Sequence, residues 1–134
     1  MIGLRAALVI ALAFGASCSP TPLSADGLVA APDFHWKEQL FCTIERASKP
    51  TDVGYSFTLT GLKGSEPSAT FQSGNGSPLK AVFEDDRIIT LQQVAWATGS
   101  VDTIIVDKNH GIFARSATGM LGSGYADGSF GVCR

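Results

Sequence analysis

The sequence predicts an all-β domain: a small antiparallel meander of about seven or eight strands, folded as a barrel or a sandwich and closed by one disulfide. Three observations lead to this prediction. From Phe34 onward, apolar and polar residues alternate with a period of two, which is typical of strands that bury one face. Turn-forming residues separate these runs, and regular turns between short strands indicate a meander. The domain also carries one cysteine near each end, Cys42 and Cys133.

The alternating runs define the expected strands, which comprise residues 40–45, 55–60, 69–71, 79–84, 87–95, 103–106, 111–116 and 128–133. Residues 87–95 are rich in β-branched types, so we expect this strand to be covered on both faces. Tight hairpins are expected at residues 84–87 and 107–111. The only helix expected is a single turn near residues 34–39, and the Gly-rich stretch that starts at Gly122 is expected to be a loop ahead of the last strand.

Residues 1–17 have the pattern of a secretory signal peptide. Arg5 is the only charged residue, an apolar run covers residues 6–14, and small residues follow. A transmembrane helix needs about 20 apolar residues, and this run is much shorter. We therefore expect an exported protein with three parts: a signal peptide at 1–17, a flexible tether at 18–33 and a single β domain at 34–134.

Cys18 follows the leader directly, in the sequence Gly-Ala-Ser-Cys at residues 15–18. This stretch resembles the bacterial lipobox, in which a cysteine becomes the lipidated N-terminus; it departs from the pattern at Gly15, where that family prefers Leu. The Pro- and Ser-rich residues after Cys18 suit an extended tether. The resemblance implies a lipoprotein whose only membrane contact is the lipid anchor, and Ser19 favours the outer membrane. The alternative is ordinary cleavage, after Ser17 or Ala25, into the periplasm.

With Cys18 assigned to lipid, Cys42 and Cys133 remain. An exported compartment is oxidising, so a disulfide is expected between them. Closing a loop of this length stabilises a domain by roughly 4–5 kcal/mol in the chain-entropy model. No paired Cys and His spacing suggests a zinc site.

No catalytic set is evident. His35 and His110 are isolated and are expected to be surface residues, and the acidic run at residues 84–86 is expected to be a solvated turn. The net charge is −2 and the basic residues are scattered, which disfavours a nucleic-acid partner. We therefore expect neither enzymatic activity nor a cofactor or metal ion.

Residues 91–99, Leu-Gln-Gln-Val-Ala-Trp-Ala-Thr-Gly, look like the segment Leu-x-Gln-Val-x-x-Ala-Ser-Gly of the periplasmic and membrane-bound inhibitors of C-type lysozyme. Those proteins are small, exported, disulfide-stabilised β-barrels in which the Ser-Gly loop and a following tyrosine approach the lysozyme active site. The resemblance implies a binding loop made of Thr98, Gly99, Ser100 and Asp102. It covers nine residues; Asp102 stands in place of the tyrosine, and the tryptophan-bearing strand of that family is not evident.

Three functions are consistent with these features. The first is a non-enzymatic envelope module that binds a protein or another envelope component through loops on a rigid β scaffold. The second is inhibition of C-type lysozyme. The third is a barrel that holds a small apolar ligand, because Trp36, Trp96 and the phenylalanines could line a cavity. The sequence leaves the oligomeric state open.

Overall fold

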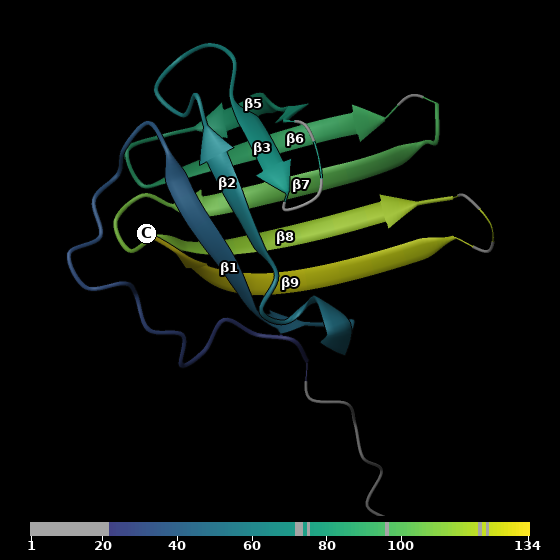
Figure 1. The fold of residues 1–134 in the computed structure, drawn as a ribbon, viewed down its shortest axis with the longest axis horizontal. Coiled ribbons are helices and arrows are strands. Elements are labelled where there is room, and N and C mark those ends of the chain that lie inside the picture. The colour runs from purple at the N-terminus through teal and green to yellow at the C-terminus, as the bar shows by residue number, and fades with distance from the viewer. Residues whose placement is uncertain (1–21, 72–73, 75, 96, 121, 123) are drawn as a thin grey trace, which may run out of the picture.

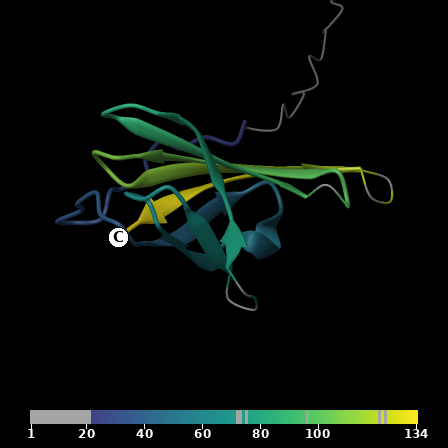
Figure 2. The ribbon, with the colours of Figure 1, turned by 90° about the horizontal axis from the view of Figure 1, so that it is seen from above.

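A single antiparallel sheet of nine strands curls into a nearly closed barrel (Figures 1 and 2). The computed structural model describes residues 22–71, 74, 76–95, 97–120, 122 and 124–134. The predicted all-β meander is confirmed, and of the two architectures considered, the barrel is the one adopted. The short strand at residues 77–78 brings the number of strands above the seven or eight expected.

The strand order is β4-β3-β2-β1-β9-β8-β7-β6-β5. Each strand pairs with its neighbours in sequence, except that β4 and β5 do not pair and β1 pairs with β9. The two edge strands are separated only by Leu79, so one bent stretch of chain pairs first with β3 and then with β6. The strands are β1 (Leu40–Ala47), β2 (Ser56–Thr60), β3 (Ser68–Phe71), β4 (Ser77–Pro78), β5 (Lys80–Glu84), β6 (Ile88–Ala95), β7 (Ser100–Asp107), β8 (Ile112–Gly119) and β9 (Tyr125–Cys133), with a 3-10 turn, η1 (Pro50–Asp52), after β1.

The predicted disulfide joins Cys42 on β1 to Cys133 on β9. The two residues face each other in the ladder, with Cα atoms 4.0 Å apart. The adjacent pair, Phe41 and Arg134, exchanges both backbone hydrogen bonds at 2.8 and 2.9 Å. A narrow, non-hydrogen-bonded position next to such a pair is where two opposed side chains come closest. The bond therefore ties the first strand to the last within the ladder, and both sulfurs are buried in the core.

The core fills one end of the barrel, the end at which β9 finishes (left in Figure 1). Phe113 of β8 packs edge-on against Phe57 of β2, with ring centroids 5.2 Å apart. Gly131 of β9 makes this contact possible, because a Cβ there would lie 2.0 Å from the carbonyl oxygen of Thr43 and 2.6 Å from the Phe113 ring. The buried apolar residues are Leu40, Cys42, Ile44, Phe57, Leu59, Leu62, Ala69, Leu79, Ile89, Leu91, Ile104, Val106, Phe113 and Cys133.

The predicted helical turn at residues 34–39 is wrong, since this stretch contains no helix. Alternate aromatic residues anchor it instead. Phe34 lies against Gly111, where a Cβ would come within 2.5 Å of the ring. Trp36 packs on the core, and the Lys108 ammonium lies 5.2 Å from the centre of its ring. Anchors two residues apart suit an extended chain rather than a helix.

Two strand predictions need correction. Strand β6 is not covered on both faces, because only Ile89 and Leu91 are fully buried and Val94 on the other face is 40% exposed. Strand β5 is exposed along its whole length. A bulge shifts its register, so that Ala81 pairs with Leu91 but Phe83 pairs with Thr90 on the outer face. The regular alternation expected at residues 79–84 is therefore broken by a bulge.

The Gly-rich stretch is not all loop, because β9 begins at Tyr125. At the N-terminal side, residues 22–33 of the expected tether form no strand or helix. The Arg46 guanidinium donates hydrogen bonds to the carbonyl oxygens of Ser24, at 2.9 Å, and of Asp26. This part of the tether is thereby held against the domain. The predicted signal peptide and Cys18 lie outside the described residues.

Candidate functional site

The inner face of the barrel changes from apolar to polar along β6–β9. Alternate residues of a strand point to the same face, so Arg115 and Ala117 share the inner face with buried Phe113. In the ladder, Arg115 lies opposite Ser129, and Ala117 lies opposite Asp127. The polar end is the one that carries the β6–β7 and β8–β9 hairpin tips (right in Figure 1).

Arg115 and Asp102 form the central ion pair of this end. Arg115 Nε lies 3.0 Å from Asp102 Oδ1, and Nη2 lies 2.6 Å from Oδ2. Only 21% and 19% of the two side chains are exposed. Burial acts to lower the pKa of Arg115, but the hydrogen bonds and the charge of Asp102 outweigh it, so the pKa is raised. Arg115 therefore stays charged at any physiological pH.

The same guanidinium reaches the opposite side of the barrel. Its central carbon lies 4.8 Å from the centroid of the Phe71 ring on β3, within the range of a cation–π contact. Phe71 in turn contacts Tyr55 and Phe57, with centroids 6.2 and 5.5 Å away. Arg115 thus connects the β7–β9 side of the barrel to the β2–β3 side.

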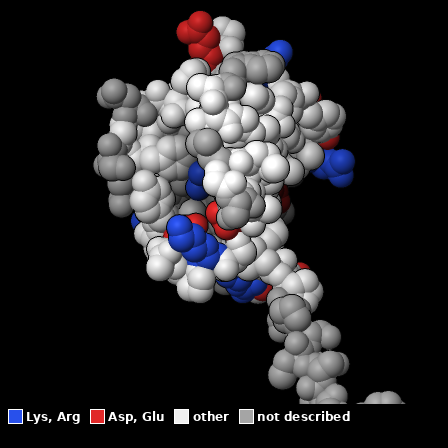
Figure 3. All heavy atoms as spheres, turned by 90° about the vertical axis from the view of Figure 1, so that its right-hand side faces the viewer, with Lys and Arg blue, Asp and Glu red and all other residues white. Residues whose placement is uncertain are grey.

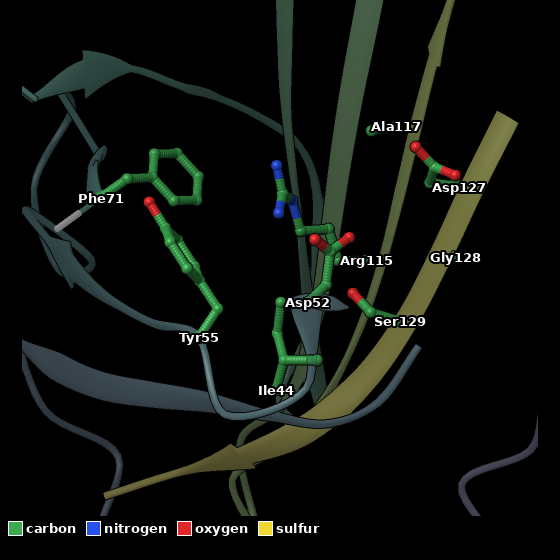
Figure 4. A pocket seen from close by; sticks show the side chains of 9 residues that line it. All are labelled: Ile44, Asp52, Tyr55, Phe71, Arg115, Ala117, Asp127, Gly128 and Ser129. Carbon is green, nitrogen blue, oxygen red and sulfur yellow. The ribbon is translucent and has the colours of Figure 1, made fainter. Parts of the chain in front are cut away.

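A hollow lies on each side of Arg115. The first, of about 290 Å³, opens between Arg115 and Tyr55 (Figure 4). The second, of about 150 Å³, opens between Arg115 and Tyr125. Both are lined by Arg115 and Ala117, and we call the two hollows together the polar cleft. Seen from this end of the molecule, basic and acidic side chains lie next to each other around the opening (Figure 3).

The first hollow contains more acidic than basic groups. Asp52, supplied by η1, and Asp127, on β9, both line it, and neither forms an ion pair with any described residue. The hydroxyl-bearing residues Tyr55 and Ser129 complete the polar lining. In the second hollow the polar lining is supplied by Gln93, Ser100, Asp102, Arg115 and Tyr125. The cleft therefore offers hydrogen-bond donors and acceptors on both sides of Arg115.

The four residues of the predicted binding loop are divided between two places. Thr98 and Gly99 are exposed at the tip of the β6–β7 hairpin, where both amides donate to the carbonyl oxygen of Ala95 at 3.1 and 2.8 Å. Gly99 has a φ of +66°, which favours glycine at this turn position. Ser100 starts β7, with its Oγ 2.9 Å from Thr98 Oγ1. Asp102 is not in the loop, because its carboxylate binds Arg115 inside the cleft.

Sequence reasoning did not single out Asp52, Tyr55, Arg115 or Asp127 as site residues. The sequence does contain a sign of Arg115, because this residue lies two positions after Phe113 and therefore on the same face of the strand. The other residues of that face are apolar or small, so a charged side chain stands out there. No comparable local signal exists for Asp52, which reaches the cleft only through the fold.

Other candidate groups lie away from the cleft. His35 and His110 are exposed, and His110 Nδ1 lies 2.8 Å from Asp107 Oδ2 in the β7–β8 turn. In the described ranges, no three His, Cys, Asp or Glu side chains are grouped so that they could hold a metal ion. No helix in the described part of the chain is long and apolar enough to cross a bilayer. Trp96, one of the aromatics expected to line a cavity, lies outside the described residues.

No protein-family model matches this sequence, and comparison with curated proteins gives no match either.

Proposed function

We propose that this chain is a non-enzymatic, exported envelope protein that binds its ligand in the polar cleft at the open end of the barrel. The observation that carries the proposal is the Arg115–Asp102 pair. Burying an ion pair incurs a desolvation cost that apolar residues would avoid, and apolar residues fill the other end of the same barrel. A role in binding accounts for charged residues at these inward positions.

Export and a lipid on Cys18 are part of the proposal. The disulfide is consistent with an oxidising compartment. Ser24, which Arg46 holds, lies six positions after Cys18, and six residue steps of extended chain span at most about 21 Å. A lipid at Cys18 would therefore keep the barrel close to the membrane surface. In the native host, Cys18→Ala should release the protein from membranes, and peptides from residues 1–17 should be absent from the mature protein; unchanged membrane association would exclude the lipid anchor.

The binding proposal is tested by filling the cleft. Ala117 lines both hollows, so Ala117→Phe should obstruct them without removing a core side chain. Ala114 lies on the outer face of the same strand, so Ala114→Phe is the matched control. The mature protein is sedimented with envelopes from a strain that lacks it. Wild type and Ala114→Phe should bind saturably, and Ala117→Phe should bind at least about tenfold more weakly. Equal binding by all three proteins would overturn the proposal.

A second candidate function, inhibition of C-type lysozyme, is favoured by the exposed β6–β7 tip with its small residues Thr98 and Gly99. The net charge of −2 would steer the domain towards a basic enzyme. The mature protein should inhibit lysis of a bacterial suspension, and Thr98→Trp should weaken inhibition. Asn109→Trp, at an exposed turn of the opposite end, is the control. Absence of inhibition at a tenfold molar excess would exclude this candidate.

A further inference from the structure

The polar cleft is shaped as two adjoining hollows rather than one pocket. They have volumes of about 290 and 150 Å³ and meet at Arg115 and Ala117. Together they reach the lower end of the volumes typical of small-molecule sites. A ligand that occupies both must pass over the Arg115–Asp102 pair, which suits a chain of at least two linked units better than a single compact group.

A ligand that spans both hollows and carries charge of one sign is disfavoured in one of them. Asp52 and Asp127 would repel an anion in the first hollow. A cation in the second hollow would lie against the Arg115 guanidinium, while the neighbouring carboxylate, Asp102, is already engaged by two nitrogens of that group. A neutral ligand with many hydroxyl groups has no such conflict, because it can donate to carboxylates and accept from the guanidinium and hydroxyl groups.

Each hollow also has an aromatic ring. Tyr55 lines the first hollow, where its ring is supported by Phe71. Tyr125 lines the second and lies over Gly119, where a Cβ would come within 2.5 Å of the ring. The missing side chain at Gly119 therefore lets the Tyr125 ring approach the sheet closely. Tyrosine combines an apolar face with a polar end, which matches a sugar ring, whose C–H face is apolar and whose edge carries hydroxyls.

From these features we infer that the polar cleft binds a neutral glycan, with one sugar ring against Tyr55 and a second against Tyr125. This inference rests on the proposed binding function and names its ligand class. The Arg115–Asp102 pair lies between the two ring positions and offers hydrogen bonds to the linkage and the adjoining hydroxyls.

The test compares tetrasaccharides that have the same number of rings but different charge. Full-length mature protein is titrated by calorimetry with N-acetylated chitotetraose, which is neutral, with its deacetylated form, which is cationic, and with tetragalacturonate, which is anionic. Cellotetraose is a second neutral probe. We expect saturable binding of at least one neutral tetrasaccharide and affinities at least about fivefold lower for both charged ones. Tighter binding of a charged tetrasaccharide, or no binding of either neutral one, would overturn the inference.

Variants localise the binding. Tyr125→Ala should weaken neutral-glycan binding by about fivefold or more, and Tyr55→Phe, which keeps the ring but removes the hydroxyl, should weaken it by a smaller factor. Phe83→Ala is the control, because Phe83 is similarly exposed (52% against 45% for Tyr125) but lies on β5, outside the cleft. Thermal unfolding of each variant establishes that it is folded, and Ala117→Phe replaces Tyr125→Ala if the latter is not. Equal losses in Phe83→Ala and the cleft variant would contradict the assignment.

The envelope assay separates failure of this inference from failure of the proposed function. If the ligand is a glycan, binding to envelopes should survive protease treatment of the envelopes. Binding that Ala117→Phe abolishes but that protease also removes would identify a protein ligand in the same cleft. That result would overturn the glycan inference and leave the proposed binding function in place.

Discussion

The two ends of the barrel interior are built from the same strands but filled with different residues. On β8 the inner face changes from Phe113 to Arg115 within two residues, and on β7 it changes from Ile104 to Asp102. At the apolar end, side chains from both sides of the barrel meet in a core that includes the disulfide. At the polar end, the two sides are connected by one guanidinium over one aromatic ring, with hollows on either side.

Each of the long strands therefore has one end that stabilises the fold and another end that lines the polar cleft. The groups of the cleft, apart from Asp52 and Tyr55, lie on strands whose other halves are fixed in the core. Rigid elements hold binding groups more precisely than loops do. We therefore expect substitutions at the apolar end to affect unfolding, and substitutions at the polar end to affect binding more than stability.

The largest effect is expected for the disulfide at the apolar end. Cys42→Ala with Cys133→Ala removes a link that spans 91 residues of sequence, which in the chain-entropy model is a loss of about 4–5 kcal/mol. Guanidinium-induced unfolding of the two proteins measures the difference. A loss below about 1 kcal/mol would show that the barrel does not depend on this closure.

A slightly smaller loss is expected when the core itself is opened. Phe57 is 1% exposed and contacts both Phe71 and Phe113, so Phe57→Ala should cost about 3–4 kcal/mol through lost burial and a cavity. Phe83→Ala, on exposed β5, should change the unfolding free energy by less than about 0.5 kcal/mol. Similar costs at the two positions would mean that the outer face of β5 stabilises the fold as much as the barrel interior does.

At the polar end, the ion pair should contribute little net stability. Asp102→Leu leaves the Arg115 guanidinium without its partner and should cost about 1–2 kcal/mol. Adding Arg115→Met to Asp102→Leu should restore stability to about the wild-type value, because an apolar pair avoids the desolvation cost. The double variant should nevertheless lose binding to envelopes. If the double variant is as unstable as the single one, the pair serves the fold rather than the ligand.

The sequence predicted the apolar end well and the polar end poorly. Period-two alternation located nearly all the strands, and the expectation of an oxidising compartment led to the Cys42–Cys133 bond, which the fold contains. The strand prediction depends only on the pattern of neighbouring residues, and the disulfide prediction depends only on the number and type of residues. The cleft depends on contacts between strands far apart in sequence, such as Arg115 with Phe71, and nothing in a single sequence specifies such contacts. Contacts of Phe34 and Trp36 with distant residues likewise keep residues 34–39 extended, where a helical turn was expected. In β5, a bulge interrupts the regular pairing that the alternation of residues predicted.

The smallest predicted effect concerns Asp107, the last residue of β7, beside the exposed β7–β8 turn at the apolar end. Burial acts to raise the pKa of this carboxyl, but hydrogen bonds from the His110 side chain and from the backbone amides of Asn109 and His110 lower it below its ordinary value of 3.8. A carboxyl whose pKa is depressed by folding contributes stability above its unfolded pKa and loses it as the pH falls through the folded one. Asp107→Asn keeps an oxygen that accepts the amide bonds but removes the charge.

The variant should therefore be less stable than wild type at pH 6 by no more than about 0.5 kcal/mol, since the side chain is partly exposed, and the difference should shrink towards pH 2. Asp85 also has a lowered pKa, through hydrogen bonds from the amides of Ile88 and Arg87. Because Asp85 is present in both wild type and the Asp107→Asn variant, its contribution to the pH dependence cancels when the two are compared. His110→Ala, which removes the side-chain partner but keeps the backbone amide, should reproduce part of the effect. Thermal unfolding between pH 2 and pH 6 measures all three proteins. A difference that stays constant with pH would mean that the turn, and not the charge, stabilises this end of the barrel.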